Sequence, residues 1–290
     1  MSQLSIQHRK CPHCGSLTFV KRGYFYKKST KTYIPRYNCK HCLKTYSTRT
    51  HSPTFKQIRS DLNAPLFRLL TGGVSIRESA RILDCSYKTA YLKSIWLGRL
   101  AKSFHLKQRF IIQELQFDEM FSIEHTKLKP LSILLAVDDK YRIIGAQVAK
   151  TKATGLLAAI SYKKYGPRPN ETSKKIPELL HQIREQSGAI PLIKTDENPH
   201  YQTHVKKIFK GSTHQTFLSA EQKEKSREQK YLSTEKKKFD PLFAVNHTCA
   251  KLRDHIKRLA RRSWCITKQS EHLELAIYLY IAKINQYKLL

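Results

Sequence analysis

Acidic residues are scarce in this sequence, and its first sixty positions contain none. The chain has 22 Asp and Glu against 54 Lys and Arg, which gives a formal net charge of +32. A chain this basic binds nucleic acid through the phosphates almost whatever its fold. No amphipathic anchor or lipidation signal accompanies the charge, so nucleic acid is favoured over a membrane as the partner.

Long apolar runs are also missing. No uninterrupted stretch approaches the ~18 residues that a membrane-spanning helix needs, and residues 1–8 lack the apolar core of a signal peptide. We therefore expect a cytoplasmic protein associated with the nucleoid. The hydrophobic content of 40% in 290 residues supports one substantial core plus one or two small modules.

Cysteines are few, but four of the seven stand in two Cys-x-x-Cys pairs near the N-terminus. The pairs are Cys11 with Cys14 and Cys39 with Cys42. Each pair can fill two corners of a Zn²⁺ tetrahedron from a tight turn, so the spacing predicts a zinc ribbon with short strands over 17–26 and 33–37. A redox dithiol, the alternative, would need a surrounding βαβ pattern that the sequence lacks.

Basic side chains interleaved with tyrosines surround these cysteines, and no acid is present to pair with them. Such a mixture suits phosphate contact and base stacking, whereas the alternative is a solvated surface. The candidate DNA contacts here are Lys21, Arg22, Lys27 and Lys28.

Residues 51–108 carry the pattern of a helix-turn-helix. After a first helix near 65–70, Ser75 predicts the start of a second, with Glu78 completing a capping box. A third helix over 87–97 follows a tight turn and is basic on its outer side. Its candidate DNA contacts are Lys88 and Lys93. A three-helix packing unit without groove contact is the alternative.

Two aspartates follow short apolar runs in the remainder of the chain. A strand over 110–117 would end at Asp118, and a strand over 191–195 would end at Asp196. A hairpin from 131–137 to 143–148 and helices near 154 and at 176–186 lie between them, which predicts an α/β domain with a mixed sheet. At neighbouring strand ends the two carboxylates could hold divalent ions ~4 Å apart, as in two-metal phosphoryl transfer.

The chain then continues through a basic loop at 219–238 into a long helix predicted over 246–262. The expected buried stripe of that helix is Cys249, Leu252, Ile256 and Leu259. Its basic face predicts a track for phosphates, and the alternative is again a solvated surface. The candidate contacts are Lys257, Arg258, Arg261 and Arg262.

Together these segments resemble a bacterial insertion-sequence transposase of the DDE class. The most specific matches are Phe117-Asp118-Glu119-Met120, Thr195-Asp196 with Tyr201, Leu252-Arg253 leading into 256–261, and the segment 264–268. The resemblance implies a zinc ribbon at 1–50, a helix-turn-helix at 51–108 and an RNase H-like catalytic domain at 109–290. It also implies strand cleavage and transfer on double-stranded DNA, with Mg²⁺ or Mn²⁺, by a homo-oligomer.

One position departs from the family pattern, which has a third carboxylate where this chain has Asn246. An asparagine carbonyl can coordinate Mg²⁺ but brings no charge. Asp254 lies ~12 Å further along the helix, and only a loop rearrangement would bring in Glu235 or Asp240. We therefore expect Asp118, Asp196 and Asn246 to form the catalytic set.

Two other functions stay open. A non-catalytic DNA-binding protein derived from a transposase would keep the zinc ribbon and the helix-turn-helix, with Asn246 marking lost chemistry. An RNA-processing nuclease would have to recognise the 2′-hydroxyl, and nothing in the sequence provides for that.

Overall fold

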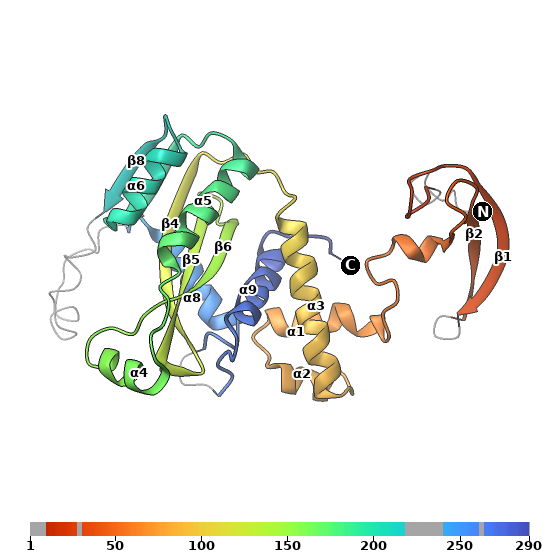
Figure 1. Ribbon diagram of the computed structural model, residues 1–290, viewed down its shortest axis with the longest axis horizontal. Coiled ribbons are helices and arrows are strands. Elements are labelled where there is room, and N and C mark those ends of the chain that lie inside the picture. The colour runs from red at the N-terminus through yellow and green to blue at the C-terminus, as the bar shows by residue number, and fades with distance from the viewer. Residues whose placement is uncertain (1–9, 28–30, 218–239, 261–263, 290) are drawn as a thin grey trace. The chain divides into compact units, whose positions relative to one another are not determined.

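The computed structural model describes residues 10–27, 31–217, 240–260 and 264–289 (Figure 1). Four predicted features lie outside the described residues, namely the basic loop at 219–238, Lys28, Arg261 and Arg262. The chain separates into two units, residues 1–62 with 290 and residues 63–289. Within the described ranges, no helix combines the length and the apolar character that crossing a membrane requires.

The first unit is a three-stranded antiparallel sheet with short 3-10 helices after it. Its elements are β1 (Phe19–Lys27), β2 (Thr32–Cys39), β3 (Thr45–Ser47), η3 (Thr48–His51) and η4 (Ser60–Leu62). The core is small, with Cys11, Tyr37, Cys39 and Tyr46 buried and the ring of Phe19 packed edge-on against Tyr37 at 5.1 Å. So small a core leaves much of the stability to the cysteines and what they bind.

The second unit is built around a five-stranded mixed sheet of order β6-β5-β4-β7-β8. Its strands are β4 (Glu114–Glu124), β5 (Thr126–Asp138), β6 (Ile143–Lys150), β7 (Leu192–Asp196) and β8 (Thr213–Phe217). Strands β4, β5 and β6 are antiparallel neighbours, whereas β7 runs parallel to β4 and β8 parallel to β7. The predicted mixed α/β class and the hairpin between β5 and β6 are confirmed.

Strand β4 differs from the prediction. It begins at Glu114 and continues through Asp118 to Glu124, so Asp118 lies within the strand and not at its end. The cause is the long partner β5, which pairs with β4 along its length and places Leu135 opposite Asp118. Such pairing overrides the low strand propensity of aspartate. On the other side, the pairing of β4 with β7 ends at Phe117, one residue before Asp118.

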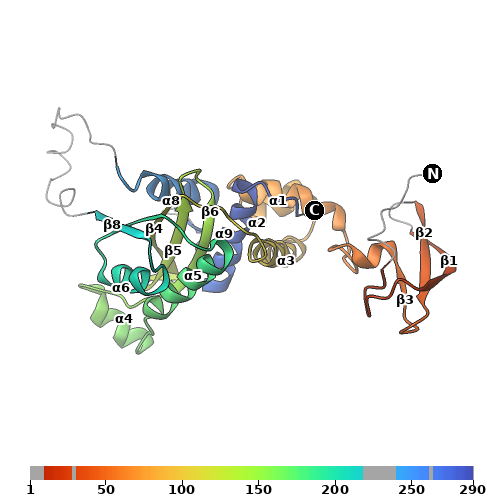
Figure 2. The ribbon, with the colours of Figure 1, turned by 90° about the horizontal axis from the view of Figure 1, so that it is seen from above.

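Helices cover both faces of this sheet (Figure 2). Helices α5 (Thr172–Ser187) and α6 (Pro199–Ile208) pack on one face, and α8 (Phe243–His255) and α9 (Ser270–Ile284) pack on the other, while α4 (Leu157–Tyr165) contacts β5. Successive strand residues point to opposite faces. Because Met120 is buried with α8 and α9 and Phe117 with α5 and α6, Asp118 shares the α8 side with Gln116, and Glu119 lies on the α6 side.

Three further helices precede the sheet in the same unit, α1 (Asn63–Thr71), α2 (Ile76–Ile82) and α3 (Tyr87–His105). Ser75 caps α2 by accepting a hydrogen bond from the amide of Glu78 at 3.1 Å, as predicted. Ser86 caps α3 in the same way with the amide of Thr89 at 3.1 Å. The predicted starts of α2 and α3 are confirmed.

Helix α3 continues eight residues beyond the predicted end at 97 because it packs along α9. The contact is close at Gly98, where an added Cβ would lie 2.7 Å from the Cβ of Leu275. At the end of α3 the buried ring of His105 contacts the carbonyl of Ile144 and the hydroxyl of Tyr287, each at 2.8 Å. Burial lowers the pKa of His105 to about 4. The three helices are therefore fixed to the sheet.

Candidate metal and DNA sites

The four cysteines of the two Cys-x-x-Cys pairs meet in the first unit, with all four Sγ atoms within 4.8 Å of one another. The shortest separations are 3.6 Å between Cys11 and Cys42 and 3.5 Å between Cys14 and Cys39. A tetrahedral site with Zn–S bonds of ~2.3 Å places its sulfurs ~3.8 Å apart, whereas a disulfide requires ~2.05 Å. The geometry therefore fits zinc.

Both pairs use the same turn. The amide of Gly15 donates to the carbonyl of Cys11 at 2.9 Å, and the amide of Leu43 donates to the carbonyl of Cys39 at 3.0 Å. Gly15 and Leu43 each have a positive φ, 78° and 58°, which directs the chain back after the second cysteine. The Cys42 amide donates to Sγ of Cys39 and lowers the pKa of that thiol, which favours the thiolate that zinc binds.

In the second unit, Asp118 is half-buried on the α8 side of β4. Its Oδ1 accepts a hydrogen bond of 2.7 Å from the amide of Glu119. Burial, together with the charges of Asp196, Glu119 and Asp240, raises the pKa of Asp118 to about 6. At neutral pH the Asp118 carboxylate is therefore ionised, and its ionisation lowers the stability of the fold. The neighbouring charges that raise its pKa are all negative.

Asp196 is the last residue of β7, as predicted. Its Oδ1 accepts from the amide of Asn198 at 3.1 Å, and Asn198 in turn caps α6 through the amide of His200 at 3.0 Å. Strand β7 lies beside β4, and the charge of Asp196 acts on Asp118. The structure thus brings the two predicted aspartates together on neighbouring strands.

Tyr201 of α6 lies beneath these two strands. Its ring packs edge-on against Phe117 with centroids 4.9 Å apart, and its hydroxyl is fully buried with no hydrogen-bond partner among the described residues. Burial raises the pKa of Tyr201, and the charges of Glu119, Asp118 and Asp196 raise it further. The unpartnered hydroxyl therefore lies close enough to the carboxylates to feel their charge.

Asp240 is a third carboxylate whose charge acts on Asp118, and from the sequence we expect it near the site only after a loop rearrangement. The charge of Asp240, which lies just before α8, is among those that raise the pKa of Asp118. Its Oδ1 accepts from the amide of Leu242 at 2.9 Å, and its Oδ2 accepts from Nδ2 of Asn246 at 2.8 Å. An Asp-Pro pair just before a helix is the signal that could have located it, since an aspartate side chain readily accepts from the backbone amide two residues further on.

No ion pair joins Asp118, Asp196 or Asp240 to a lysine or arginine within the described ranges. This is unexpected in a chain with a net charge of +32. Among the described residues, the four cysteines are the one close group of three or more side chains that could ligate a metal. The three carboxylates lie further apart than the cysteines do. Carboxylate oxygens are the ligands that Mg²⁺ and Mn²⁺ prefer, so these three side chains suit either ion.

The candidate DNA contacts are placed unevenly. Lys21, Arg22 and Lys88 are exposed and Lys27 is half-buried, on β1 and at the start of α3. Lys93 differs from the expected outward position, because it is buried and its Nζ donates to Oδ1 of Asn63 at 2.8 Å. A lysine held in this way ties α3 to α1 and does not present its charge to a phosphate.

Helix α8 ends at His255 and not at 262 as predicted. The expected apolar stripe of Cys249, Leu252, Ile256 and Leu259 is buried. Lys257 is exposed, while Arg258 lines a cavity of about 620 Å³ between α1, α2, α3 and α9, where burial lowers its pKa. The other residues at the mouth of this cavity include Arg77, Tyr87, Tyr91, Trp264 and Lys268. Basic and aromatic groups therefore gather there, although not on one helix face.

No protein-family model matches the sequence, and no curated protein matches it. Among solved structures, the chain is similar to one in the cryo-EM structure of a simian T-cell lymphotropic virus intasome in complex with the PP2A regulatory subunit B56 gamma. The identity is 12% and the TM-score is 0.32, over 74% of this chain and 65% of that chain. A score this low does not establish a shared fold.

Proposed function

We propose that this protein is a DDE-class transposase that cleaves and joins DNA strands at the ends of an insertion sequence. One observation carries the proposal. In a chain with a net charge of +32, the charges of Asp196 and Asp240 both raise the pKa of Asp118 on a mixed sheet, and no lysine or arginine of the described residues forms an ion pair with any of the three. Clustered carboxylates beside DNA-binding elements suit a divalent metal that acts on a phosphodiester.

The proposed division of labour follows the chain. Residues 1–50 form the zinc ribbon and residues 51–108 the helix-turn-helix, and both hold double-stranded DNA at the element's ends. Residues 109–290 form an RNase H-like catalytic domain. Its sheet supports this assignment, since three antiparallel strands are followed by two parallel ones and helices cover both faces. A homo-oligomer would pair the two ends.

The chemistry divides between the metal and the chain. Bound Mg²⁺ or Mn²⁺ would supply Lewis-acid polarisation of the scissile phosphate. Asp118 and Asp196 would hold the metal from β4 and β7, and Asn246 contributes from α8. The fixed strands keep the two carboxylates in place without cost at the moment of reaction, and α8 and α9 cover that side of the sheet.

A strand-cleavage and strand-transfer assay tests this function. Zinc-loaded protein would be incubated with Mn²⁺ and a duplex that carries the gene's own flanking ends. We expect nicking at the element's ends and joined products from the wild type, and neither from Asp196→Asn, while both proteins bind the duplex equally. Equal activity of Asp196→Asn and wild type would contradict the proposed site.

The competing function is a DNA-binding protein without catalysis. The four clustered cysteines, the capped helices α2 and α3 and the basic surface would serve it equally well. If the wild type binds the flanking ends but neither cuts nor joins them under any divalent metal, that function replaces the transposase.

A further inference from the structure

The side chain of Asn246 points its amide at a carboxylate. Nδ2 of Asn246 donates to Oδ2 of Asp240 at 2.8 Å, and the backbone amide of Asn246 continues the first turn of α8 by donating to the carbonyl of Leu242. The amide of Asn246 is thus used on Asp240, and its remaining carbonyl oxygen carries no charge. The negative group at this corner of the site is therefore Asp240.

The first turn of α8 is clamped to β4 next to Asp118. The side chain of Gln116, only 6% exposed, accepts from the amide of Val245 at 3.1 Å and donates to the carbonyl of Pro241 at 3.3 Å. Gln116 and Asp118 lie two residues apart on the same face of β4, a separation of ~6.7 Å along the strand. These two hydrogen bonds of Gln116, here called the clamp, hold Asp240, which precedes Pro241, near Asp118. The effect of the Asp240 charge on the pKa of Asp118 agrees with this placement.

The clamp is itself anchored. Nε2 of Gln116 also donates to Oε1 of Glu114 at 2.9 Å, and Glu114 forms an ion pair of 2.7 Å with Lys194 of β7. Strands β4 and β7 and helix α8 are joined by this chain of contacts. Asp118 lies in β4 and Asp196 in β7, and Asp240 lies just before α8.

We propose that Asp240 supplies the third anionic metal ligand of this site and that Asn246 is a positioning residue that orients it. The proposal rests on the proposed function and changes one of its residue roles. A carboxylate offers about four acceptor positions, and Asp240 uses two of them, one for the amide of Leu242 and one for Asn246. The remaining positions are available to a divalent cation, and the Asn246 contact fixes the carboxylate as outer-shell partners fix metal ligands.

Mn²⁺ binding to the zinc-loaded full chain, measured by calorimetry, tests this assignment. Asp240→Asn keeps the oxygen that accepts from the amide of Leu242 and the shape of the side chain but removes the charge, so it should weaken Mn²⁺ binding at least tenfold. Asn246→Ala should weaken it about tenfold, the usual cost of losing an outer-shell partner. The matched control is Asp254→Asn, which removes the same charge from an 82% exposed position at the other end of α8 and should leave binding unchanged.

Thermal unfolding of each variant would establish that the fold is kept. Wild-type Mn²⁺ affinity in Asp240→Asn, together with a loss in Asn246→Ala, would overturn the proposal and return Asn246 to the ligand set. A wild type that does not bind Mn²⁺ would overturn it as well. If Mn²⁺ binding follows the expected order but no DNA is cleaved, the ligand assignment stands and the transposase function fails, so the two failures are distinguishable.

Discussion

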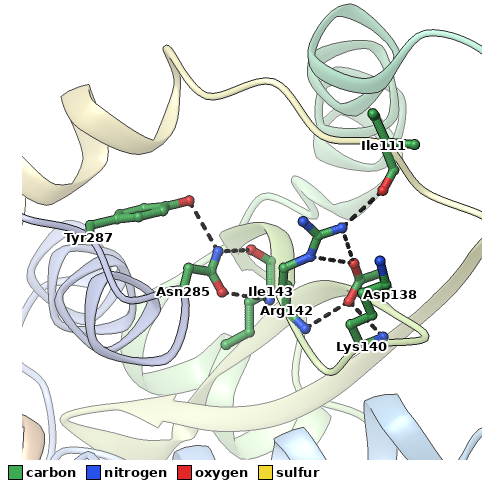
Figure 3. A network of polar contacts seen from close by, with 7 residues as sticks. All are labelled: Ile111, Asp138, Lys140, Arg142, Ile143, Asn285 and Tyr287. Carbon is green, nitrogen blue, oxygen red and sulfur yellow. Dashed lines mark hydrogen bonds and ion pairs between the residues drawn. The ribbon is translucent and has the colours of Figure 1, made fainter.

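Asp118 and Asp138 are both aspartates that directly follow an apolar run, and they lie on the neighbouring strands β4 and β5. Asp138 is fully buried but fully satisfied. Its Oδ1 accepts from the amides of Lys140 and Arg142, and its Oδ2 forms an ion pair of 2.6 Å with the Arg142 guanidinium, which also donates to the carbonyl of Ile111 (Figure 3). The guanidinium and two backbone amides thus close the turn.

Asp118 is the opposite case. It receives one backbone amide, has no described cation as partner, and feels the charges of Asp196, Glu119 and Asp240. Asp118, the aspartate without a neutralising partner, is therefore the one to which we assign the proposed function. A protein with so many lysines and arginines could pair one of them with Asp118, as Arg142 is paired with Asp138. A carboxylate left without such a partner is typical of a site that binds a metal.

The largest expected difference between the two aspartates is in catalysis. Asp118→Asn should lower the rate of strand cleavage by at least about 10³-fold, ~4 kcal/mol of transition-state stabilisation. Asp138→Asn should leave the rate per folded molecule unchanged, because the hydrogen bonds of the Asp138 side chain go to Lys140 and Arg142 of the hairpin. Single-turnover cleavage of the flanking-end duplex measures both, with duplex affinity as the control. Similar losses of cleavage rate in the two variants would contradict the assignment of catalysis to Asp118 and not to Asp138.

Stability should differ in the reverse sense. Asp138→Asn leaves the Arg142 guanidinium without its carboxylate, and breaking such a pair should lower the free energy of unfolding by about 3 kcal/mol. Urea unfolding at pH 7 measures the change. The double variant Asp138→Asn with Arg142→Gln should recover part of the loss, because no charge is then left unpaired, and no recovery would show that the pair is not the cause.

Asp118→Asn should stabilise the metal-free protein. An acid whose pKa rises from 3.8 to about 6 on folding holds its proton more tightly when folded, so stability falls as pH increases through that range. Above pH 6 the full penalty applies, of the order of 2–3 kcal/mol. The variant should therefore unfold at higher denaturant than wild type at pH 7.5 and at the same denaturant near pH 3.5. A variant less stable than wild type at pH 7.5 would contradict this.

The smallest effect concerns Tyr201. Its buried hydroxyl has no described partner, so Tyr201→Phe should change the free energy of unfolding by less than ~1 kcal/mol or raise it. The paired control is Tyr278→Phe, which removes a buried hydroxyl that donates to the carbonyl of Ala146 at 3.0 Å and should cost more. Equal losses in urea unfolding would mean that the Tyr201 hydroxyl is satisfied after all.

The parts of the fold that local chemistry determines were predictable. Cysteine spacing located the four-cysteine cluster, Ser75 and the turn before Tyr87 located α2 and α3, and the apolar runs on either side of the hairpin turn located β5 and β6. Helix α9 was not predicted, because it is apolar nearly all round where it lies between α3 and the sheet, and so lacks an amphipathic pattern. The extension of β4 beyond Asp118 depends on pairing with β5, which no local signal encodes.

The candidate site divides in the same way. Asp118 and Asp196 were predictable because each follows a short apolar run and the strands are neighbours. Asp240 was not, because its place depends on Gln116, a residue 124 positions earlier in the chain that holds the first turn of α8. Lys93 was misplaced for a related reason, since only the packing of α3 on α1 turns it inward toward Asn63.

The most direct test of the central claim is to locate the metal. Crystals of the zinc-loaded protein, equilibrated with Mn²⁺, would give anomalous differences at the manganese absorption edge. We expect manganese bound by the carboxylates of Asp118, Asp196 and Asp240, and none at Asp138, which is paired with Arg142. A structure without manganese at these three carboxylates, or with a lysine or arginine paired to Asp118, would contradict it.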